Sequence, residues 1–158
     1  MTTGKYARYI VYDQEFKKEH PPGQLAGFIG VAMDAAKVPE CKMHIGYCWN
    51  TGPNPASETY KPHVHDIDEI ILLIGTDPHD PWNLGGEVDF WFEHEKYTIT
   101  KTAMIYIPAG IQHAPLWFRV VNRPIISGTV NPEPVVSDGE LIHDPMFAEF
   151  ADLPVSRG

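Results

Sequence analysis

The chain has 158 residues, enough for one domain with a substantial core, and no linker-like stretch divides it, so we expect a single domain over residues 1–158. Its formal net charge is −9 and it contains no basic run, which argues against a nucleic-acid partner. No apolar run reaches the roughly 18 residues that a membrane span needs, and the first residues lack the apolar segment of a secretory signal, so no membrane partner and a cytoplasmic location are expected.

Turn-forming residues are abundant. Fifteen prolines and thirteen glycines indicate many turns and short elements rather than long helices, which favours an all-β fold. The two cysteines, Cys41 and Cys48, lie seven positions apart and would fall on opposite faces of one strand, so a disulfide between them is not expected.

The first 50 residues predict three strands. Residues 5–12 (KYARYIVY) are aromatic and β-branched, which is typical of a strand, here an N-terminal extra strand. Residues 25–33 predict another strand, with a helical turn left open as the alternative. Residues 42–50 alternate between apolar odd and more polar even positions. This period predicts a half-buried strand whose Tyr47 and Trp49 face the interior.

The stretch 61–76 (KPHVHDIDEIILLIGT) holds the candidate metal ligands. In an extended strand His63, His65 and Glu69 project to the same side, because side chains alternate between faces. A fourth candidate, His113, follows a Pro-Ala-Gly turn on what we expect to be a separate strand, where a folded sheet could bring it opposite the first three. Imidazole and carboxylate together suit first-row transition metals, so the pattern predicts a metal site.

The surroundings of Glu69 strengthen its candidacy as a ligand. Glu69 precedes an apolar run, and a carboxylate in a barrel interior is costly unless it is paired or bound to a cation.

Other ionisable residues are weaker candidates. Asp66 and Asp68 have the opposite strand parity, and we favour solvated turn residues over an acid/base role for them. The remaining histidines have no second ligand at strand or helix spacing and are interpreted as surface or hydrogen-bonding residues: His20, His44, His79, His94 and His143.

The second half of the chain predicts further strands and a helical tail. Residues 87–93 and 96–100 predict a hairpin after a turn-rich excursion, and later strands are expected at 103–107, 116–121 and 124–130. Eight to ten strands are typical of a jelly roll or small barrel. In the tail, 131–158, Asp144 and Pro145 predict the start of a short helix. Four apolar residues share one face of this helix: Met146, Phe147, Phe150 and Leu153.

At these residues the sequence resembles the cupin superfamily. Its first motif contains His-x-His followed after three or four residues by Glu, as His63, His65 and Glu69 are here; its second contains Pro-x-Gly followed by His, matched by residues 108–113. The sequence departs from the family pattern at three positions, none of which is a metal ligand in the family. Ser57 and Thr102 each stand where the family has Gly, and Trp117 stands where it has Asn. In addition, Gly75 closes the first motif one residue early.

The resemblance covers about residues 42–130 and implies a double-stranded β-helix barrel, or jelly roll, with a metal bound by His63, His65, Glu69 and His113. We expect the metal to be a divalent transition ion, Fe, Mn, Ni, Co or Zn, because this ligand set accepts all five. The resemblance also implies a homodimer. We expect the N-terminal strand or the tail to cross between subunits, and Trp91 to make a subunit contact or lie under a loop.

A substrate pocket is expected beside the metal. Aromatic residues that could form its walls are also typical of ordinary barrel core, which is the favoured alternative for each of them. The aromatic candidates are Tyr47, Trp49, Tyr106, Trp117 and Phe118, and Gln112 is a further, polar candidate. For Gln112, hydrogen bonding to a ligand and capping of the turn remain equally open.

Two classes of function fit this pattern. The first is a metalloenzyme of dioxygenase, lyase or isomerase type acting on a small organic molecule, with no catalytic residue identified outside the ligands. The alternative is a non-catalytic module that binds or senses a small ligand in the same pocket. Epimerases of this fold typically work without metal, and the intact ligand set argues against that type.

Overall fold

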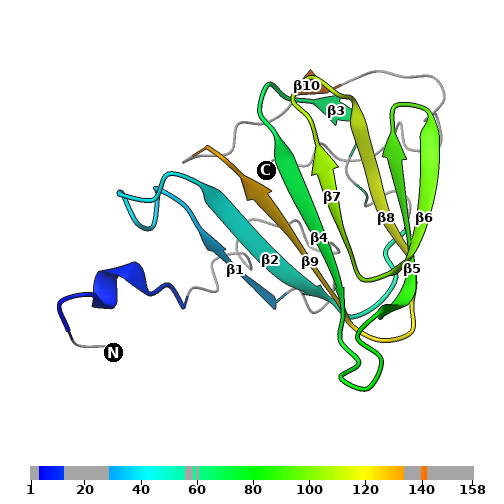
Figure 1. Cartoon of the computed structure of the whole chain (residues 1–158), viewed down its shortest axis with the longest axis horizontal. Helices are drawn as coiled ribbons and strands as arrows, with labels where there is room; N and C mark the ends of the chain where they lie inside the picture. Colours follow the sequence, from blue (N-terminus) through cyan, green and yellow to red (C-terminus); the bar gives the residue numbers. More distant parts are fainter. Residues whose placement is uncertain (1–3, 13–28, 56–58, 60, 134–139, 142–158) are drawn as a thin grey trace.

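Two five-stranded antiparallel sheets face each other in the computed structural model, which describes residues 4–12, 29–55, 59, 61–133 and 140–141 (Figure 1). The first sheet has the strand order β1-β2-β9-β4-β7 and the second has the order β10-β3-β8-β5-β6. The elements are η1 (Ala7–Tyr9), β1 (Ile29–Met33), β2 (His44–Asn50), β3 (His63–Val64), β4 (Glu69–Gly75), β5 (Asn83–Phe92), β6 (Glu95–Lys101), β7 (Ala103–Ile107), β8 (His113–Val121), β9 (Ile125–Asn131) and β10 (Glu140–Leu141).

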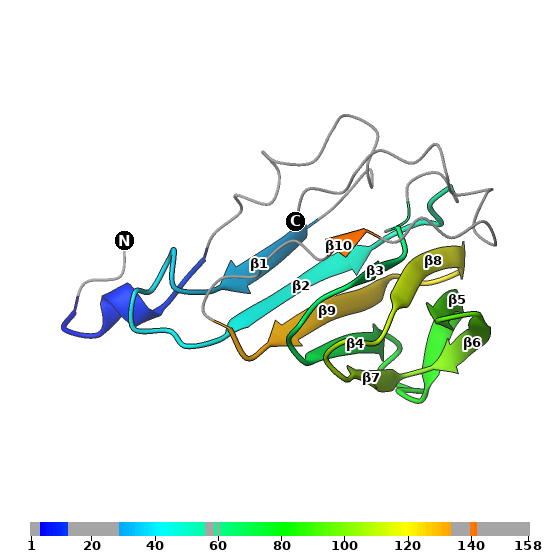
Figure 2. The same cartoon turned by 90° about the horizontal axis from the view of Figure 1, so that it is seen from above.

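The chain passes repeatedly between the two sheets. From β2 onward, only the β5–β6 hairpin keeps consecutive strands in the same sheet. Short turns rich in Gly and Pro permit these crossings, as the composition predicts. Figure 2 shows the two layers from above, with β1 and β2 extending beyond the second sheet. The all-β prediction is confirmed, and the strands form a two-sheet sandwich of jelly-roll type.

The core lies between the sheets. Odd-numbered residues of β4 point inward, so Ile71 and Leu73 are buried, whereas Ile74 is exposed. They pack with residues of β5, β7, β8 and β9, and the buried cluster consists of Ile71, Leu73, Leu84, Val88, Phe90, Ile107, Phe118 and Ile125. Burial of these side chains holds the strands that position the candidate ligands.

The predicted strand at residues 5–12 is wrong. A short 3₁₀ turn, η1, occupies residues 7–9, and no residue of η1 is buried. Tyr6 and Tyr12 are 62% and 70% exposed. Aromatic composition alone favours a strand only where a neighbouring strand pairs with it, and none pairs with this segment within the described part of the chain. The second predicted strand is confirmed over Ile29–Met33 as β1.

The predicted orientation of β2 is also wrong. Its even-numbered residues face the interior, where Gly46 and Asn50 are buried, and its Tyr47 is 43% exposed. The interior is polar at this point, since Asn50 Nδ2 donates hydrogen bonds to Ser127 Oγ (2.8 Å) and to the Ile125 carbonyl (3.2 Å). An alternating pattern distinguishes two faces but does not say which one is buried when the buried face carries polar residues.

The remaining expectations concern the cysteines, Trp91, the C-terminal helix and a membrane span. Cys41 and Cys48 are both free, as expected. Trp91 is buried, at 6% exposure, and the Nζ atom of Lys96 lies over its ring, 5.8 Å from the centroid. The helix predicted after Asp144 lies outside the described residues. Among the helices described, none has the length and apolar character needed to cross a membrane.

Candidate metal centre

Three histidines converge at one end of the sandwich. His63 lies on β3, His113 begins β8, and these two residues pair directly across the antiparallel β3–β8 ladder. His65 follows β3. The potential ligand atoms of His63, His65 and His113 all lie within 4.8 Å of one another, so the three residues form a group that could hold a metal ion.

Glu69 joins this group from the other sheet. It begins β4, and its Oε2 lies 3.2 Å from His65 Nε2 and 3.3 Å from His113 Nε2. The sequence argument placed His63, His65 and Glu69 on one continuous strand. The chain instead leaves β3 after residue 64 and enters β4 at residue 69, so the residues meet through tertiary structure rather than through strand parity.

Backbone carbonyls fix the tautomer of each histidine. The Nδ1 atoms of His63, His65 and His113 lie 2.8, 2.8 and 2.9 Å from the carbonyl oxygens of residues 61, 67 and 111. A carbonyl oxygen only accepts, so each Nδ1 must carry the hydrogen. In the neutral rings each Nε2 therefore presents a lone pair, which is the state in which imidazole binds a metal.

The Nε2 lone pairs of two rings face a carboxylate. With Nδ1 protonated, neutral His65 and His113 have no hydrogen to donate to Glu69 from Nε2, and acceptor atoms 3.2–3.3 Å apart repel one another. His113 Nε2 is fully buried without a satisfied hydrogen bond. A cation among these atoms, either a proton or a metal ion, removes the conflict. The donor set of three imidazole nitrogens and one carboxylate fits a divalent transition metal.

Burial and charge act together on the ionisable groups. Burial lowers the pKa of His63, and the nearby His113 lowers it further, which favours the neutral ring. Burial alone would raise the pKa of Glu69, but a proton on Nε2 of His113 or His65 donates a hydrogen bond to the carboxylate and places a positive charge beside it, so with a ring in that state the Glu69 pKa lies below its ordinary value. Neutral imidazole and ionised carboxylate are the protonation states that metal binding requires.

Asp68 has a role that the sequence argument missed. It is exposed, as a solvated turn residue should be, yet its Oδ1 accepts a hydrogen bond from the Ala109 backbone N–H at 2.9 Å. This bond lowers the Asp68 pKa, and a hydrogen bond with Tyr106 lowers it further. The Gly110 N–H donates to the His65 carbonyl at 2.9 Å. These contacts join the loop after His65 to the turn before His113, so they set the distance between two candidate ligands.

The six predicted pocket residues do not form one group. Tyr47 and Tyr106 lie on the outer side of the first sheet, 43% and 56% exposed, because they share the parity of residues that point away from the core. Trp117 donates from Nε1 to the Asn54 carbonyl at 2.9 Å, and Phe118 belongs to the buried core. Trp49 is half-buried on β2, next to the buried Asn50, and Gln112 is half-buried next to His113. A substrate role for any of the six stays a prediction.

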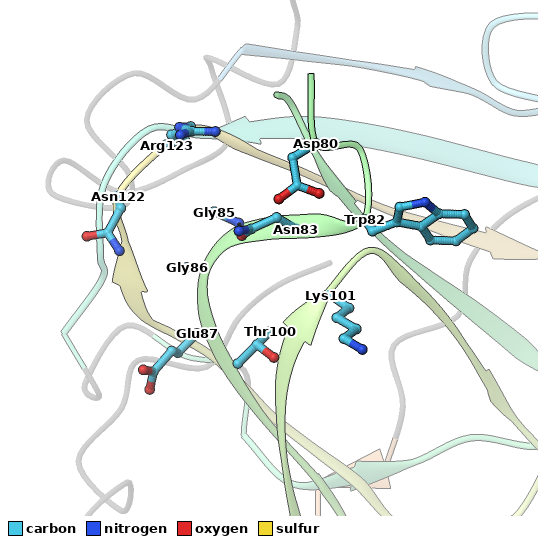
Figure 3. A pocket seen from close by; sticks show the side chains of 10 residues that line it. All are labelled: Asp80, Trp82, Asn83, Gly85, Gly86, Glu87, Thr100, Lys101, Asn122 and Arg123. Carbon is cyan, nitrogen blue, oxygen red and sulfur yellow. Dashed lines mark hydrogen bonds between the residues drawn. The ribbon is translucent and has the colours of Figure 1, made fainter. Parts of the chain in front are cut away.

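A concavity lies at the end of β5 that is opposite the histidine group. It has a volume of about 520 Å³ and is lined by residues around the start of β5, the end of β6 and the turn after β8 (Figure 3). Asp80, Lys101 and Asn122 contribute polar groups, but its lining contains no histidine or cysteine. The histidine group pairs with the other end of β5, where His113 lies opposite Phe92. The two features are therefore separate.

Comparisons by sequence find no relatives. No protein-family model matches the chain, and no curated protein matches it. Comparison with solved structures does find similar proteins. A cupin 2 domain-containing protein from Halorhodospira halophila is 10% identical with a TM-score of 0.54, and the alignment covers 77% of this chain and 73% of that chain.

Two enzymes are also similar. A deletion mutant of Bacillus subtilis oxalate decarboxylase is 14% identical with a TM-score of 0.50, over 89% of this chain and 36% of that one. The DMSP lyase DddQ from Ruegeria pomeroyi is 17% identical with a TM-score of 0.45, over 77% of this chain and 55% of that one. This chain therefore spans about half the length of the lyase. At these identities the likeness concerns the fold. The chain has the cupin fold. The three histidines that cluster in the structure are the same residues that match the metal-ligand positions of the cupin motifs in the sequence.

Proposed function

We propose that this chain is a metal-dependent enzyme acting on a small organic molecule, with His63, His65, His113 and Glu69 as ligands of a divalent transition metal. One observation carries the proposal: three imidazoles held as Nδ1–H tautomers bring their potential ligand atoms within 4.8 Å of one another, and two of them, His65 and His113, place Nε2 at 3.2 and 3.3 Å from a carboxylate oxygen of Glu69. In a cluster with a purely structural role, each hydrogen-bond acceptor would lie opposite a hydrogen-bond donor. This cluster places acceptors together, which is the arrangement that a cation stabilises.

The protein supplies orientation and exclusion of water. Carbonyls of residues 61, 67 and 111 hold the rings, and Glu69 contributes the negative charge that offsets part of a divalent ion. Ile107, which pairs with Glu69 across the β4–β7 ladder, is fully buried and keeps the base of the site apolar. A bound metal would polarise a substrate oxygen as a Lewis acid or, if redox-active, exchange electrons with dioxygen. Four protein ligands leave room for substrate on a six-coordinate ion.

Metal binding is tested first. Protein purified without chelators is analysed by mass spectrometry for bound metal, and the metal-free protein is titrated with Fe, Mn, Ni, Co and Zn. We expect one metal per chain, and loss of that metal in His113→Ala. The matched control is His79→Ala, because His79 is an exposed histidine outside the cluster. A wild-type protein that takes up none of these metals would overturn the proposal.

Turnover is tested separately on the metal-loaded protein. A panel of thiols, diketones, catechols and small carboxylic acids, including oxalate and DMSP from the names of the similar enzymes, is screened by oxygen uptake and product mass spectrometry. We expect conversion of at least one class by the wild type and none by His113→Ala. Saturable ligand binding without conversion would instead identify the non-catalytic binding module, the alternative that the sequence left open.

A further inference from the structure

Two polar side chains on the inner face of the first sheet lie in line with Glu69. His44 on β2 pairs with Asn131 on β9, and both residues project to the inward side of the sheet. Strands β9 and β4 pair at Val130 and Ile70, so the next residues, Asn131 and Glu69, are neighbours on that inward side. His44, Asn131 and Glu69 therefore form a row across three strands that lie side by side (Figure 2).

Both polar side chains have polar atoms without a hydrogen-bond partner. Asn131 is 2% exposed, and within the described part of the chain its amide makes no hydrogen bond. The Nδ1 atom of His44 is also buried without a satisfied hydrogen bond, although 16% of the His44 side chain is exposed. An unpaired buried polar group destabilises a fold, so it is expected mainly where a ligand, an ion or water completes its hydrogen bonding.

Asp34, which follows β1, determines the tautomer of His44. Its Oδ1 accepts hydrogen bonds from the backbone N–H groups of Ala36 (2.9 Å) and Lys37 (3.2 Å), which hold the carboxylate in place. Its other oxygen, Oδ2, lies 3.5 Å from His44 Nδ1. A carboxylate oxygen attracts the ring hydrogen to Nδ1, so Nε2 of the neutral ring keeps a lone pair that can accept a hydrogen bond.

The spacing of the row suits a small ligand. Neighbouring strands lie about 4.8 Å apart, so the backbones at His44 and Glu69 are about 10 Å apart, with Asn131 between them. Glu69 Oε2 lies 3.2 Å from His65 Nε2 and 3.3 Å from His113 Nε2, so this end of the row belongs to the candidate metal centre. A small molecule with one oxygen at that centre would extend across Asn131 toward His44.

We propose that His44 and Asn131 bind a hydroxyl group at the end of the substrate that is remote from the metal, with Asp34 as a positioning residue. The inference rests on the proposed function, because it concerns the same site. A hydroxyl group satisfies both side chains, since its O–H donates to Nε2 of neutral His44 and its oxygen accepts from the Asn131 amide. A carboxylate there would meet the His44 lone pair and the charge of Asp34, so the substrate class is a small hydroxylated acid rather than a diacid.

Matched acids that differ by one hydroxyl group test the proposal. Calorimetry on the metal-loaded wild type compares propionate, butyrate and valerate, each with the same acid carrying a hydroxyl at its far end. We expect the hydroxylated acid of at least one pair to bind at least about 10-fold more tightly, and succinate to bind no more tightly than butyrate. Equal affinities within every pair would overturn this inference and leave metal binding untouched. A wild type that takes up no metal would overturn the proposed function as well.

Two variants of conserved shape separate ligand binding from folding. His44→Phe keeps a ring without nitrogen atoms, and Asn131→Leu keeps the side-chain size without an amide. Both should lose the preference for the hydroxylated acid and keep the metal content of the wild type, whereas His79→Ala, at an exposed histidine outside the row, should keep both. A folded His44→Phe or Asn131→Leu variant that retains the preference would overturn the proposal.

Urea unfolding of Asn131→Leu gives a readout that needs no ligand. Because the buried Asn131 amide has no partner in the described fold, its removal should leave the unfolding midpoint at or above that of the wild type. A residue kept for the stability of the fold would show the opposite result. A lower midpoint would therefore assign Asn131 a structural role and overturn its part in ligand binding.

The positioning role of Asp34 is tested by Asp34→Asn. The amide keeps the shape of the side chain, removes its charge and can donate a hydrogen to His44 Nδ1, so the ring hydrogen moves to Nε2. Nε2 then donates instead of accepting. We expect this variant to keep its metal and to bind succinate at least about 3-fold more tightly than the wild type does. An unchanged affinity for succinate would overturn the role of Asp34.

Discussion

Glu69 faces the unprotonated nitrogen atoms of His65 and His113. Its negative charge therefore has opposite effects on the stability of the metal-free protein and on metal binding. When both rings are neutral and no metal is bound, its carboxylate lies against lone pairs, which is unfavourable. With a metal present, the same carboxylate is a ligand. Glu69 should therefore lower the stability of the metal-free protein and raise its affinity for metal, and the two contributions can be measured separately.

The substitution Glu69→Gln tests this separation. The amide keeps the shape of the side chain but can donate a hydrogen to His113 Nε2, which has no satisfied hydrogen bond. We expect the metal-free variant to be at least as stable as metal-free wild type in urea unfolding, and its metal affinity to fall at least about 100-fold. A metal-free variant less stable by more than about 1 kcal/mol would contradict the lone-pair arrangement.

Asp89 is a buried carboxylate with a structural role. Burial opposes its ionisation, but hydrogen bonds from Thr98 and Arg119 and the charge of Lys96 outweigh this, so the Asp89 pKa lies below its ordinary value. A carboxyl with a lowered folded-state pKa stabilises the fold above the unfolded pKa, and this stabilisation is lost as the pH falls through the folded pKa.

The corresponding prediction concerns Asp89→Asn. An amide presents an N–H where Arg119 and Lys96 need an acceptor, so we expect about 2 kcal/mol lower free energy of unfolding at pH 7. The difference from wild type should remain full down to about pH 4, the ordinary Asp pKa, and should shrink below it. Urea unfolding at pH 7 and pH 3 measures this. An equal difference at both values would show that the charge of Asp89 is not responsible.

At the scale of elements, the loop between β3 and β4 and the turn before β8 act as one unit. Ala109 N–H donates to Asp68 and Gly110 N–H donates to the His65 carbonyl, so the backbone between His65 and Glu69 is attached to the backbone before His113. Gly110 has φ +81, a left-handed conformation in which glycine is favoured over other residues. Backbone geometry thus favours the glycine of the second motif.

Breaking this attachment should weaken metal binding without removing a ligand. We expect Asp68→Ala to lower metal affinity about 10-fold, at the lower end of the effects seen for residues that position ligands. Asp66→Ala is the matched control, because Asp66 is an exposed carboxylate of the same loop. Competition against a fluorescent chelator measures both. Equal losses in the two variants would indicate a general effect of loop charge rather than the bond to Ala109.

At the scale of the whole molecule, the candidate metal centre joins the two sheets. His63 and His113 belong to the sheet that contains β3 and β8, whereas Glu69 belongs to the facing sheet through β4. A metal bound by all of these residues would therefore resist separation of the layers. This coupling links metal binding to global stability, because a ligand that binds only the folded state stabilises it by mass action.

We accordingly expect metal to raise the thermal midpoint of the wild type. At a free metal concentration of 100 times the dissociation constant the gain is about 2.7 kcal/mol. Differential scanning calorimetry with and without metal measures it. His113→Ala should show no such gain, whereas His79→Ala should show the full gain. A rise of equal size in both variants would assign the effect to surface binding of the metal.

Local patterns in the sequence predicted the all-β fold class, and the family resemblance that they carry named the three histidines as ligands. Turn residues divide the chain into short strands, and the pairing of β3 with β8 brings His63 opposite His113. The composition of residues 5–12 misled, because a strand requires a neighbour, and pairing is a property of the folded chain.

The sequence by itself therefore determined the cupin type of sandwich and the residues that could hold a metal. Only the tertiary structure decided which side of each strand is buried. Alternation along β2 identifies two faces, but a polar interior around Asn50 and an apolar exterior around Tyr47 reverse the usual assignment. The same reversal leaves β2 with an apolar outer face that includes the exposed Ile45 and Tyr47. The physical reason is that burial depends on what packs against a strand, and this information is absent from the strand's own pattern.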